Sequence, residues 1–427
     1  MSGRPTACWD REDLLRRVRH ALDIAAQALR QLHLSKDDAA PSDLAPPLID
    51  AKVAAEAAML LRSAAFLADE DTSIARQCAG LAQLIGPQAR SEAVLASMCQ
   101  EPGAALEHAA AHIHLQALGY GDEGVDLLMQ DLLADEGLPS PGLLIKPELE
   151  YHWLRQIATG ATAERDGARL IAGACWARPL DALGAAVHDY YAFTHVVLHA
   201  SDMGRRAVQT PRPVSAIEAD AEAGLAASLD AGNFDLAAEL LWTWPMLDRP
   251  WSATAAFAFF TLAAEQDAHG FLPGPGYRSA DARNLGEAQR GAYRLQSSYH
   301  AGIVFGFLCA AALRPGRAPP ARLATGSPSE RVPQLMRQLT ERSEAASWRS
   351  AMNELDVGQQ ALLADFVLAV ILRRAAAASD LCALREGLQA AAELELADGP
   401  SPRQALALLR RAMLMARISS PSQPSSA

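Results

Sequence analysis

Apolar residues recur every three or four positions through most of this 427-residue chain, and this spacing restricts its fold more than any other feature. A period of three to four matches one face of an α-helix, whereas a half-buried strand needs strict alternation. Alanine and leucine dominate, and the β-branched residues that favour strands are sparse. The pattern predicts an all-α protein, with helices that include residues 10–34, 104–118, 180–204 and 284–313.

Proline-rich and polar stretches interrupt the helical pattern and predict the domain organisation. We expect an N-terminal helix and linker (1–48), a main α-helical domain with a central cavity (49–315), a C-terminal helical appendix (333–418) and a disordered tail (419–427). Long helices joined by short loops indicate paired helical hairpins, which would form an α/α toroid or solenoid around the cavity.

Composition excludes several classes of function. The net charge is −12 and basic residues are scattered along the sequence, so we expect no nucleic-acid partner. The longest apolar run, 301–313, is shorter than the roughly 20 residues that a membrane-spanning helix needs, and the N-terminus lacks a signal-peptide pattern. We therefore expect no membrane partner and a cytoplasmic location. The sequence has no GxGxxG, Walker or GxSxG motif, which argues against a nucleotide cofactor and a serine hydrolase.

One stretch, HDYYAFTHVVLHASD, points to a functional cavity. His188, Tyr191, His195, His199 and Asp202 recur in it at helical spacing and fall on one stripe, while the other side is apolar. A polar stripe on a buried helix needs partners or water. This helix is therefore the best candidate to line a site.

Two HxxxH pairs raise the hypothesis of a metal site. Residues four apart on a helix share a face, so His108 with His112, and His195 with His199, can each direct two imidazoles at one ion. Neither pair has Glu after its first His, so the metalloprotease pattern is absent. If a metal is bound, imidazole ligands suit zinc, iron or copper, and Asp202 could add an oxygen or orient a ligand.

The same residues also fit acid–base chemistry without a metal. We expect Tyr299 and His300 to form a second wall of the cavity, because they lie where a polar helix half meets an apolar one. The candidate catalytic residues are then His195, Asp202, Tyr299 and His300. Histidines that only satisfy buried hydrogen bonds are the structural alternative.

Two local resemblances accompany these patterns. The segment FFTLAAEQDAHGFLPGPG (259–276) resembles the inter-helix turns of α/α-toroid proteins such as terpene cyclases and prenyltransferases, which implies a shape, since their DxDD motif is absent. The segments 105–120, 190–204 and 299–313 resemble a poorly characterised family of bacterial helical proteins encoded near natural-product genes. That resemblance covers His108, His112, His195, Asp202, Tyr299 and His300.

Three functional hypotheses remain open at this point. The first is a tailoring enzyme of natural-product biosynthesis that acts on a small or peptide-derived substrate, with a histidine-bound metal as one option. The second is a non-catalytic helical scaffold that binds a partner protein or small ligand. The third is a metal-free acid–base cyclase. The oligomeric state stays open.

Overall fold

The computed structural model describes residues 10–35, 49–134, 145–160, 164–339 and 346–419. Within these ranges all regular structure is helical and no strand forms, which confirms the all-α prediction. The predicted linker at 36–48 and residues 420–427 of the predicted tail lie outside the described residues.

The helices up to residue 312 are α1 (Arg11–Ser35), α2 (Asp50–Ala64), α3 (Thr72–Ala89), α4 (Glu92–Gln100), α5 (Ala105–His108), α6 (Ala110–Gln116), α7 (Glu123–Ala134), α8 (Ile145–Thr159), α9 (Glu164–Gly173), α10 (Val187–Ala200), α11 (Val214–Asp230), α12 (Phe234–Leu241), α13 (Thr243–Met246), α14 (Ala253–His269), α15 (Ser279–Arg283) and α16 (Glu287–Ala312). The C-terminal helices are α17 (Arg331–Gln338), α18 (Ala346–Asn353), α19 (Val357–Ala361), α20 (Ala364–Ala377), α21 (Leu381–Glu393) and α22 (Pro400–Ser419). Short 3-10 turns are η1 (Ala65–Leu67), η2 (Pro102–Ala104) and η3 (Cys175–Ala177).

Polar side chains fix where several of these helices begin. The Asn233 side-chain oxygen accepts the Leu236 backbone N–H at 3.1 Å and starts α12. The Ser252 hydroxyl accepts the Ala255 backbone N–H at 3.1 Å and starts α14. Helix α14 ends at Gly270, whose φ of 73° costs glycine no steric strain. The residue at which α12 starts is thus determined by the neighbouring Asn233. This helix carries part of the site described below.

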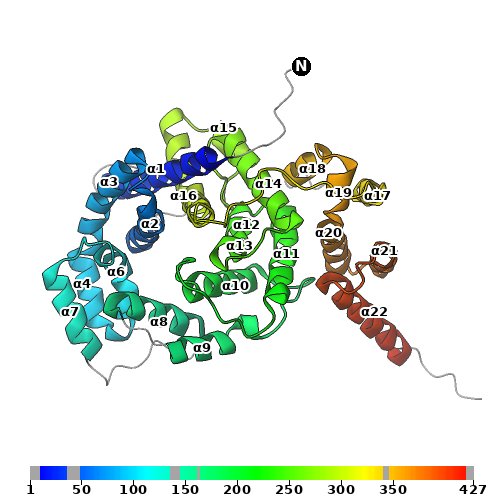
Figure 1. Ribbon diagram of the computed structural model, residues 1–427, viewed down its shortest axis with the longest axis horizontal. Helices are drawn as coiled ribbons and strands as arrows, with labels where there is room; N and C mark the ends of the chain where they lie inside the picture. Colours follow the sequence, from blue (N-terminus) through cyan, green and yellow to red (C-terminus); the bar gives the residue numbers. More distant parts are fainter. Residues whose placement is uncertain (1–9, 36–48, 135–144, 161–163, 340–345, 420–427) are drawn as a thin grey trace, which may run out of the picture.

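Helices α1 and α16 lie side by side, so the chain returns to its starting helix near residue 300 (Figure 1). Glycines allow their close approach: a Cβ on Gly306 would lie 2.4 Å from the Ala21 Cβ, and one on Gly302 would lie 2.6 Å from the Ile24 Cδ1. Larger residues at these positions would force the two helices apart.

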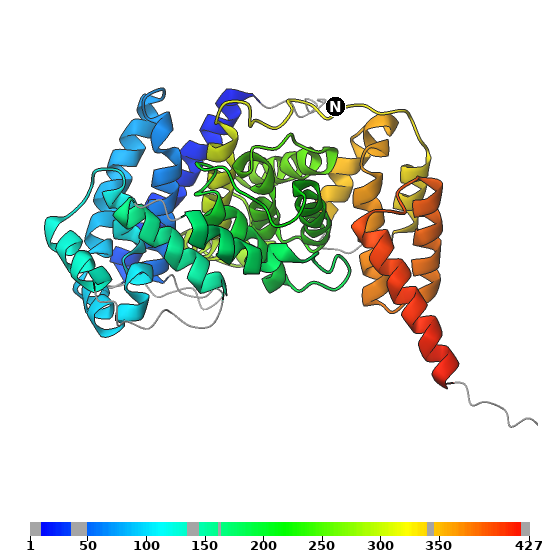
Figure 2. The ribbon, with the colours of Figure 1, turned by 60° about the horizontal axis from the view of Figure 1, so that its bottom comes forward.

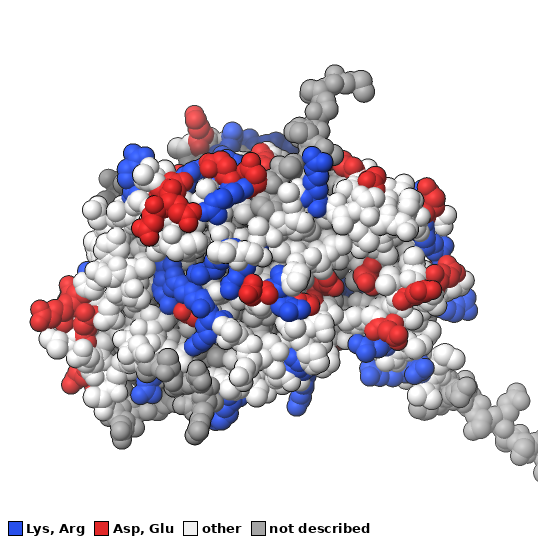
Figure 3. Space-filling model, in the orientation of Figure 1, with Lys and Arg blue, Asp and Glu red and all other residues white. Residues whose placement is uncertain are grey.

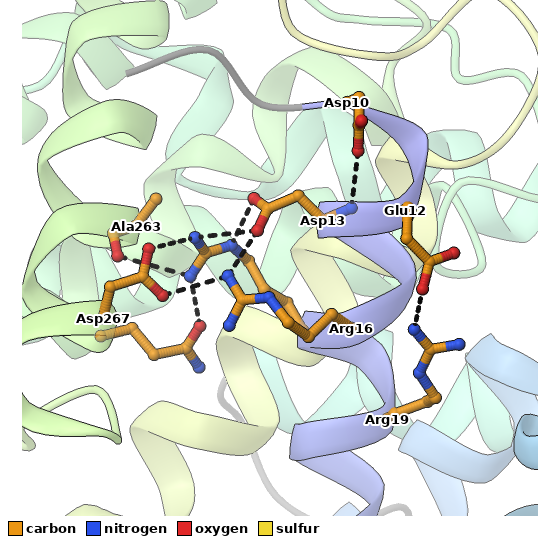
Figure 4. A network of polar contacts seen from close by, with 9 residues as sticks. Asp10, Glu12, Asp13, Arg16, Arg19, Ala263 and Asp267 are labelled. Atoms are coloured by element: carbon orange, nitrogen blue, oxygen red, sulfur yellow. Dashed lines mark hydrogen bonds and ion pairs between the residues drawn. The ribbon is translucent and has the colours of Figure 1, made fainter. Parts of the chain in front are cut away.

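Buried polar contacts also join α1 to α14, as Figure 4 shows. The Arg17 guanidinium, whose side chain is 2% exposed, donates to Asp13 at 3.0 Å, to Gln266 at 2.6 Å and to Asp267 at 2.8 Å. A buried cation needs such partners, because an unpaired charge in the interior is costly. These contacts and the α16 packing fix α1 in the main body.

In Figure 1, α12 and α13 lie among α10, α11, α14 and α16, and α17 to α22 lie together at one side. Figure 2 shows α20, α21 and α22 next to one another, and α11 packs against α20 and α22. One hydrophobic core runs from Leu14 in α1 to Ala391 in α21. The toroid or solenoid arrangement and the predicted domain boundaries stay predictions.

Two of the predicted helices differ from the structure in ways that matter for the site. The predicted helix 104–118 is split into α5 and α6 at Ala109, whose φ and ψ are −82° and 0°. The predicted helix 180–204 is helical only over α10, and it ends before Asp202, Met203 and Gly204, which have positive φ values of 48°, 59° and 78°. Left-handed residues cannot continue a right-handed helix.

None of the helices in the described ranges is both long and apolar enough to cross a membrane.

Candidate functional site

Three carboxylates and one imidazole meet between α2, α12 and α16. Asp235 and Glu239 lie four residues apart on α12, so they share a face, and both are 2% exposed. His300 comes from α16 and Glu56 from α2. We call Asp235, Glu239, His300 and Glu56 the carboxylate–histidine cluster.

The atoms of this cluster approach one another closely. His300 Nδ1 lies 3.1 Å from Glu56 Oε1, and His300 Nε2 lies 3.7 Å from Asp235 Oδ1 and 3.6 Å from Glu239 Oε1. Asp235, Glu239 and His300 each offer one ligand atom, and these three atoms lie within 4.8 Å of one another. In the described part of the chain, no other group of three or more side chains that could bind a metal comes together in this way. Two ligands about 2.1 Å from one ion cannot be more than about 4.2 Å apart, so small side-chain movements would bring all three onto a metal.

Hydroxyl groups from the first half of α10 orient the two α12 carboxylates. The Tyr191 hydroxyl donates to Asp235 Oδ2 at 2.7 Å, and the Thr194 hydroxyl donates to Glu239 Oε2 at 2.5 Å. Each carboxylate therefore has one oxygen held from outside the cluster. The second oxygen of each is the one that lies near His300. Partners of this kind are typical of metal-ligating carboxylates.

Burial and mutual repulsion shape the protonation states of the cluster. Burial alone would lower the pKa of His300, but Asp235, Glu56 and Glu239 outweigh it and raise that pKa well above its ordinary value. Burial raises the pKa of Glu239, although the nearby His300 and the hydrogen bond from Thr194 act to lower it. Burial and the neighbouring Glu56 carboxylate likewise raise the pKa of Tyr299. The cluster thus holds protons more tightly than its isolated groups would.

The cluster carries more negative than positive charge. Besides His300, the nearest cation that the structure records for these carboxylates in its described residues is Lys52, 3.7 Å from Glu56 and 53% exposed. Asp235 Oδ1 is buried and accepts no hydrogen bond. A buried carboxylate oxygen without a hydrogen bond is costly, and a bound cation would satisfy it. His300 is still 31% exposed, so one edge of the cluster reaches solvent.

The first predicted histidine pair lies apart from this cluster. His108 closes α5 and contacts Glu101 at 3.2 Å, whereas His112 is in α6 and contacts Asp126 at 2.7 Å. The helix is interrupted between them at Ala109, and each imidazole has its own carboxylate partner. The predicted metal site of His108, His112, His195 and His199 stays a prediction. To bind one ion together, His108 would have to leave Glu101 and His112 would have to leave Asp126.

The second predicted pair lies at the far end of α10, next to an aromatic group. The rings of His195 and His199 are 5.6 Å apart, and His199 stacks on Trp153 at 4.7 Å. Asp202 accepts the Trp153 indole N–H at 2.7 Å and pairs with both terminal nitrogens of Arg62 at 2.7 and 2.9 Å. The geometry of Asp202 is therefore that of a structural ion pair.

The structure brings Tyr299 and His300 to the cluster and places His188 at the surface, where its side chain is 85% exposed. The sequence interpretation missed Asp235, Glu239 and Glu56. A signal for them exists: FDLAAELLW and VAAEAAML each place acidic residues inside otherwise apolar helical segments. Buried acids of this kind are rare unless they are paired or bind a cation.

The fold and the cluster together define an all-helical protein with a buried carboxylate–histidine site. Residues 18–310 match the family described as a domain of unknown function, DUF6895, and the chain belongs to this family. The match contains every residue of the cluster and ends before α17. No curated protein and no solved structure gave a match.

Proposed function

We propose that the protein is a metal-dependent enzyme whose divalent ion is held by Asp235, Glu239 and His300, with Glu56 beside them. The observation that carries this proposal is the excess of buried carboxylates around one imidazole, with Asp235 Oδ1 lacking a hydrogen bond. A divalent cation would balance that charge, and an incomplete protein shell would leave positions for water and substrate. Two oxygen ligands and one nitrogen ligand suit manganese, iron(II) or zinc.

The open edge at His300 supports action on a small or peptide-derived substrate. A tailoring step in natural-product biosynthesis is the reaction class that we propose, with the metal acting as a Lewis acid or activating a bound water. A toroid-like frame of helices would supply the ligands from α2, α12 and α16.

Elemental analysis of protein purified without an affinity tag tests this proposal. We expect about one transition-metal ion per chain, in keeping with a single three-ligand site. The double variant Asp235→Asn/Glu239→Gln should lose it. The control variant Glu101→Gln removes an exposed carboxylate beside His108 and should keep it. Metal loss in a His108→Ala/His195→Ala variant, with none in the Asp235/Glu239 variant, would favour the four-histidine site and refute our assignment.

The raised pKa values of Glu239 and His300 favour a second candidate, acid–base catalysis without a metal. In this alternative a proton on His300, whose Nε2 lies 3.6 Å from Glu239 Oε1, takes the place of the ion. Stoichiometric metal that the Asp235→Asn/Glu239→Gln variant loses would exclude it. Protein that takes up no manganese, iron or zinc when these are supplied would support it.

A further inference from the structure

Four arginines that are scattered in the sequence come together near the C-terminal end of α10. We call Arg62, Arg205, Arg314 and Arg317 the arginine cluster. Arg205 donates to the Arg62 backbone oxygen, and Arg317 donates to the Gly204 carbonyl at 2.6 Å. The Arg314 guanidinium lies 4.9 Å from the centre of the Phe66 ring. Figure 3 shows Lys and Arg side chains gathered on this face, between α2 and α10.

The positive charge of this cluster is only partly balanced. The ion pairs of these arginines in the described residues are with Asp202 and with Asp248, which is 69% exposed. Four guanidinium groups against two carboxylates leave two positive charges uncompensated. Burial and the nearby Arg62 lower the pKa of Arg205 to about 10. Like charges that are gathered and partly buried repel one another, and an anion that binds to them would relieve this cost.

Two helices, α2 and α16, connect the arginine cluster to the carboxylate–histidine cluster, and α10 lies beside both. Helix α2 supplies Glu56 to one and Arg62 to the other, six residues further on. Helix α10 carries Tyr191 and Thr194, which donate to Asp235 and Glu239, and the turn after it carries Arg205 of the arginine cluster. Helix α16 carries His300, and Arg314 follows its end. At 1.5 Å per residue, Glu56 and Arg62 are about 9 Å apart along α2, and His300 is about 18 Å from the end of α16 at Ala312.

We propose that the arginine cluster binds the phosphate group of a small phosphorylated substrate, whose other end reaches the carboxylate–histidine cluster. Guanidinium groups recognise phosphate oxygens through paired hydrogen bonds, and a phosphate monoester carries close to the two negative charges that the cluster lacks. The role given to the second cluster rests on the proposed function. The phosphate site itself does not.

Titration calorimetry on metal-free protein tests the phosphate site without phosphate–metal precipitation. The probes are phenyl phosphate, inorganic phosphate and acetate. We expect both phosphates to bind and acetate to bind at least about tenfold more weakly, since it offers one charge instead of two. Arg314→Gln and Arg205→Gln should each weaken phenyl phosphate binding by about tenfold or more. Arg385→Gln, the same change at an exposed position on α21, should leave it unchanged.

Thermal melting of each variant shows whether it is folded, and Arg314→Lys, which keeps the charge, should retain part of the affinity. Three results would overturn the inference: no phosphate binding, equal binding of acetate, or equal losses in Arg385→Gln and the cluster variants. Binding of inorganic phosphate with exclusion of the ester would overturn the substrate assignment. The Asp235→Asn/Glu239→Gln variant should still bind phosphate, so a failure of the metal proposal would be seen separately.

Discussion

The ion pair between Arg62 and Asp202 gives the sharpest stability prediction. Asp202 accepts two bonds from Arg62, at 2.7 and 2.9 Å, and one from Trp153 at 2.7 Å, and its side chain is 19% exposed. Asp202→Asn removes the charge but keeps the size of the side chain and tolerates the φ of 48°. Removing one partner of a buried pair costs about 3–5 kcal/mol, and Asn can still accept one bond, so we expect about 3 kcal/mol.

Urea denaturation monitored by circular dichroism measures this loss at neutral pH. Burial alone would raise the pKa of Asp202, but Arg62 and Trp153 outweigh it and lower that pKa below 3.8. The stability that the carboxylate contributes is therefore present above pH 3.8 and is lost as the pH falls through its folded value. The cost of Asp202→Asn should shrink in that acidic range. Asp248→Asn, at a 69% exposed side chain, is the control and should cost less than about 1 kcal/mol. An equally small effect of Asp202→Asn would refute the reasoning.

Three further outcomes follow from the structure. Because the pKa of His300 is raised in the folded state, its charge stabilises the metal-free protein below pH 6.5, and this contribution is lost as the pH rises through the folded pKa. The urea midpoint of the wild type should therefore fall at alkaline pH, and that of His300→Gln should fall less. Parallel curves of midpoint against pH would contradict this. Gly306→Ala should destabilise the protein by about 1–3 kcal/mol, because the added Cβ would meet Ala21. Gly291→Ala, with open space around it, should be neutral or stabilise the protein by up to about 1 kcal/mol. Equal urea midpoints of the two variants would count against close α1–α16 packing. Asp202→Asn should also bind phenyl phosphate more tightly than the wild type in calorimetry, and weaker binding would mean that Arg62 has left the arginine cluster.

The helical class could be predicted because it depends on local periodicity, which the sequence displays directly. Helix α16 was predicted at 284–313 and forms at Glu287–Ala312. The break at Ala109 could not be predicted, since alanine favours helix and no local signal separates α5 from α6.

The candidate site was predicted only in part, because its side chains converge through tertiary packing. His300 and Tyr299 were found by their position at a polar–apolar border of one helix. Asp235 and Glu56 come from α12 and α2, and nothing local indicates that these two helices both face α16. The arginine cluster was missed for the same reason, since its four residues are far apart in the sequence.

Anomalous diffraction from crystals grown with manganese tests the central claim most directly. The account predicts one anomalous peak, with oxygens of Asp235 and Glu239 and a nitrogen of His300 about 2.0–2.3 Å away, as expected for ligands of a first-row metal. The same crystals of the Asp235→Asn/Glu239→Gln variant should lack it. A peak between His195 and His199, or no peak at the carboxylate–histidine cluster, would contradict the account.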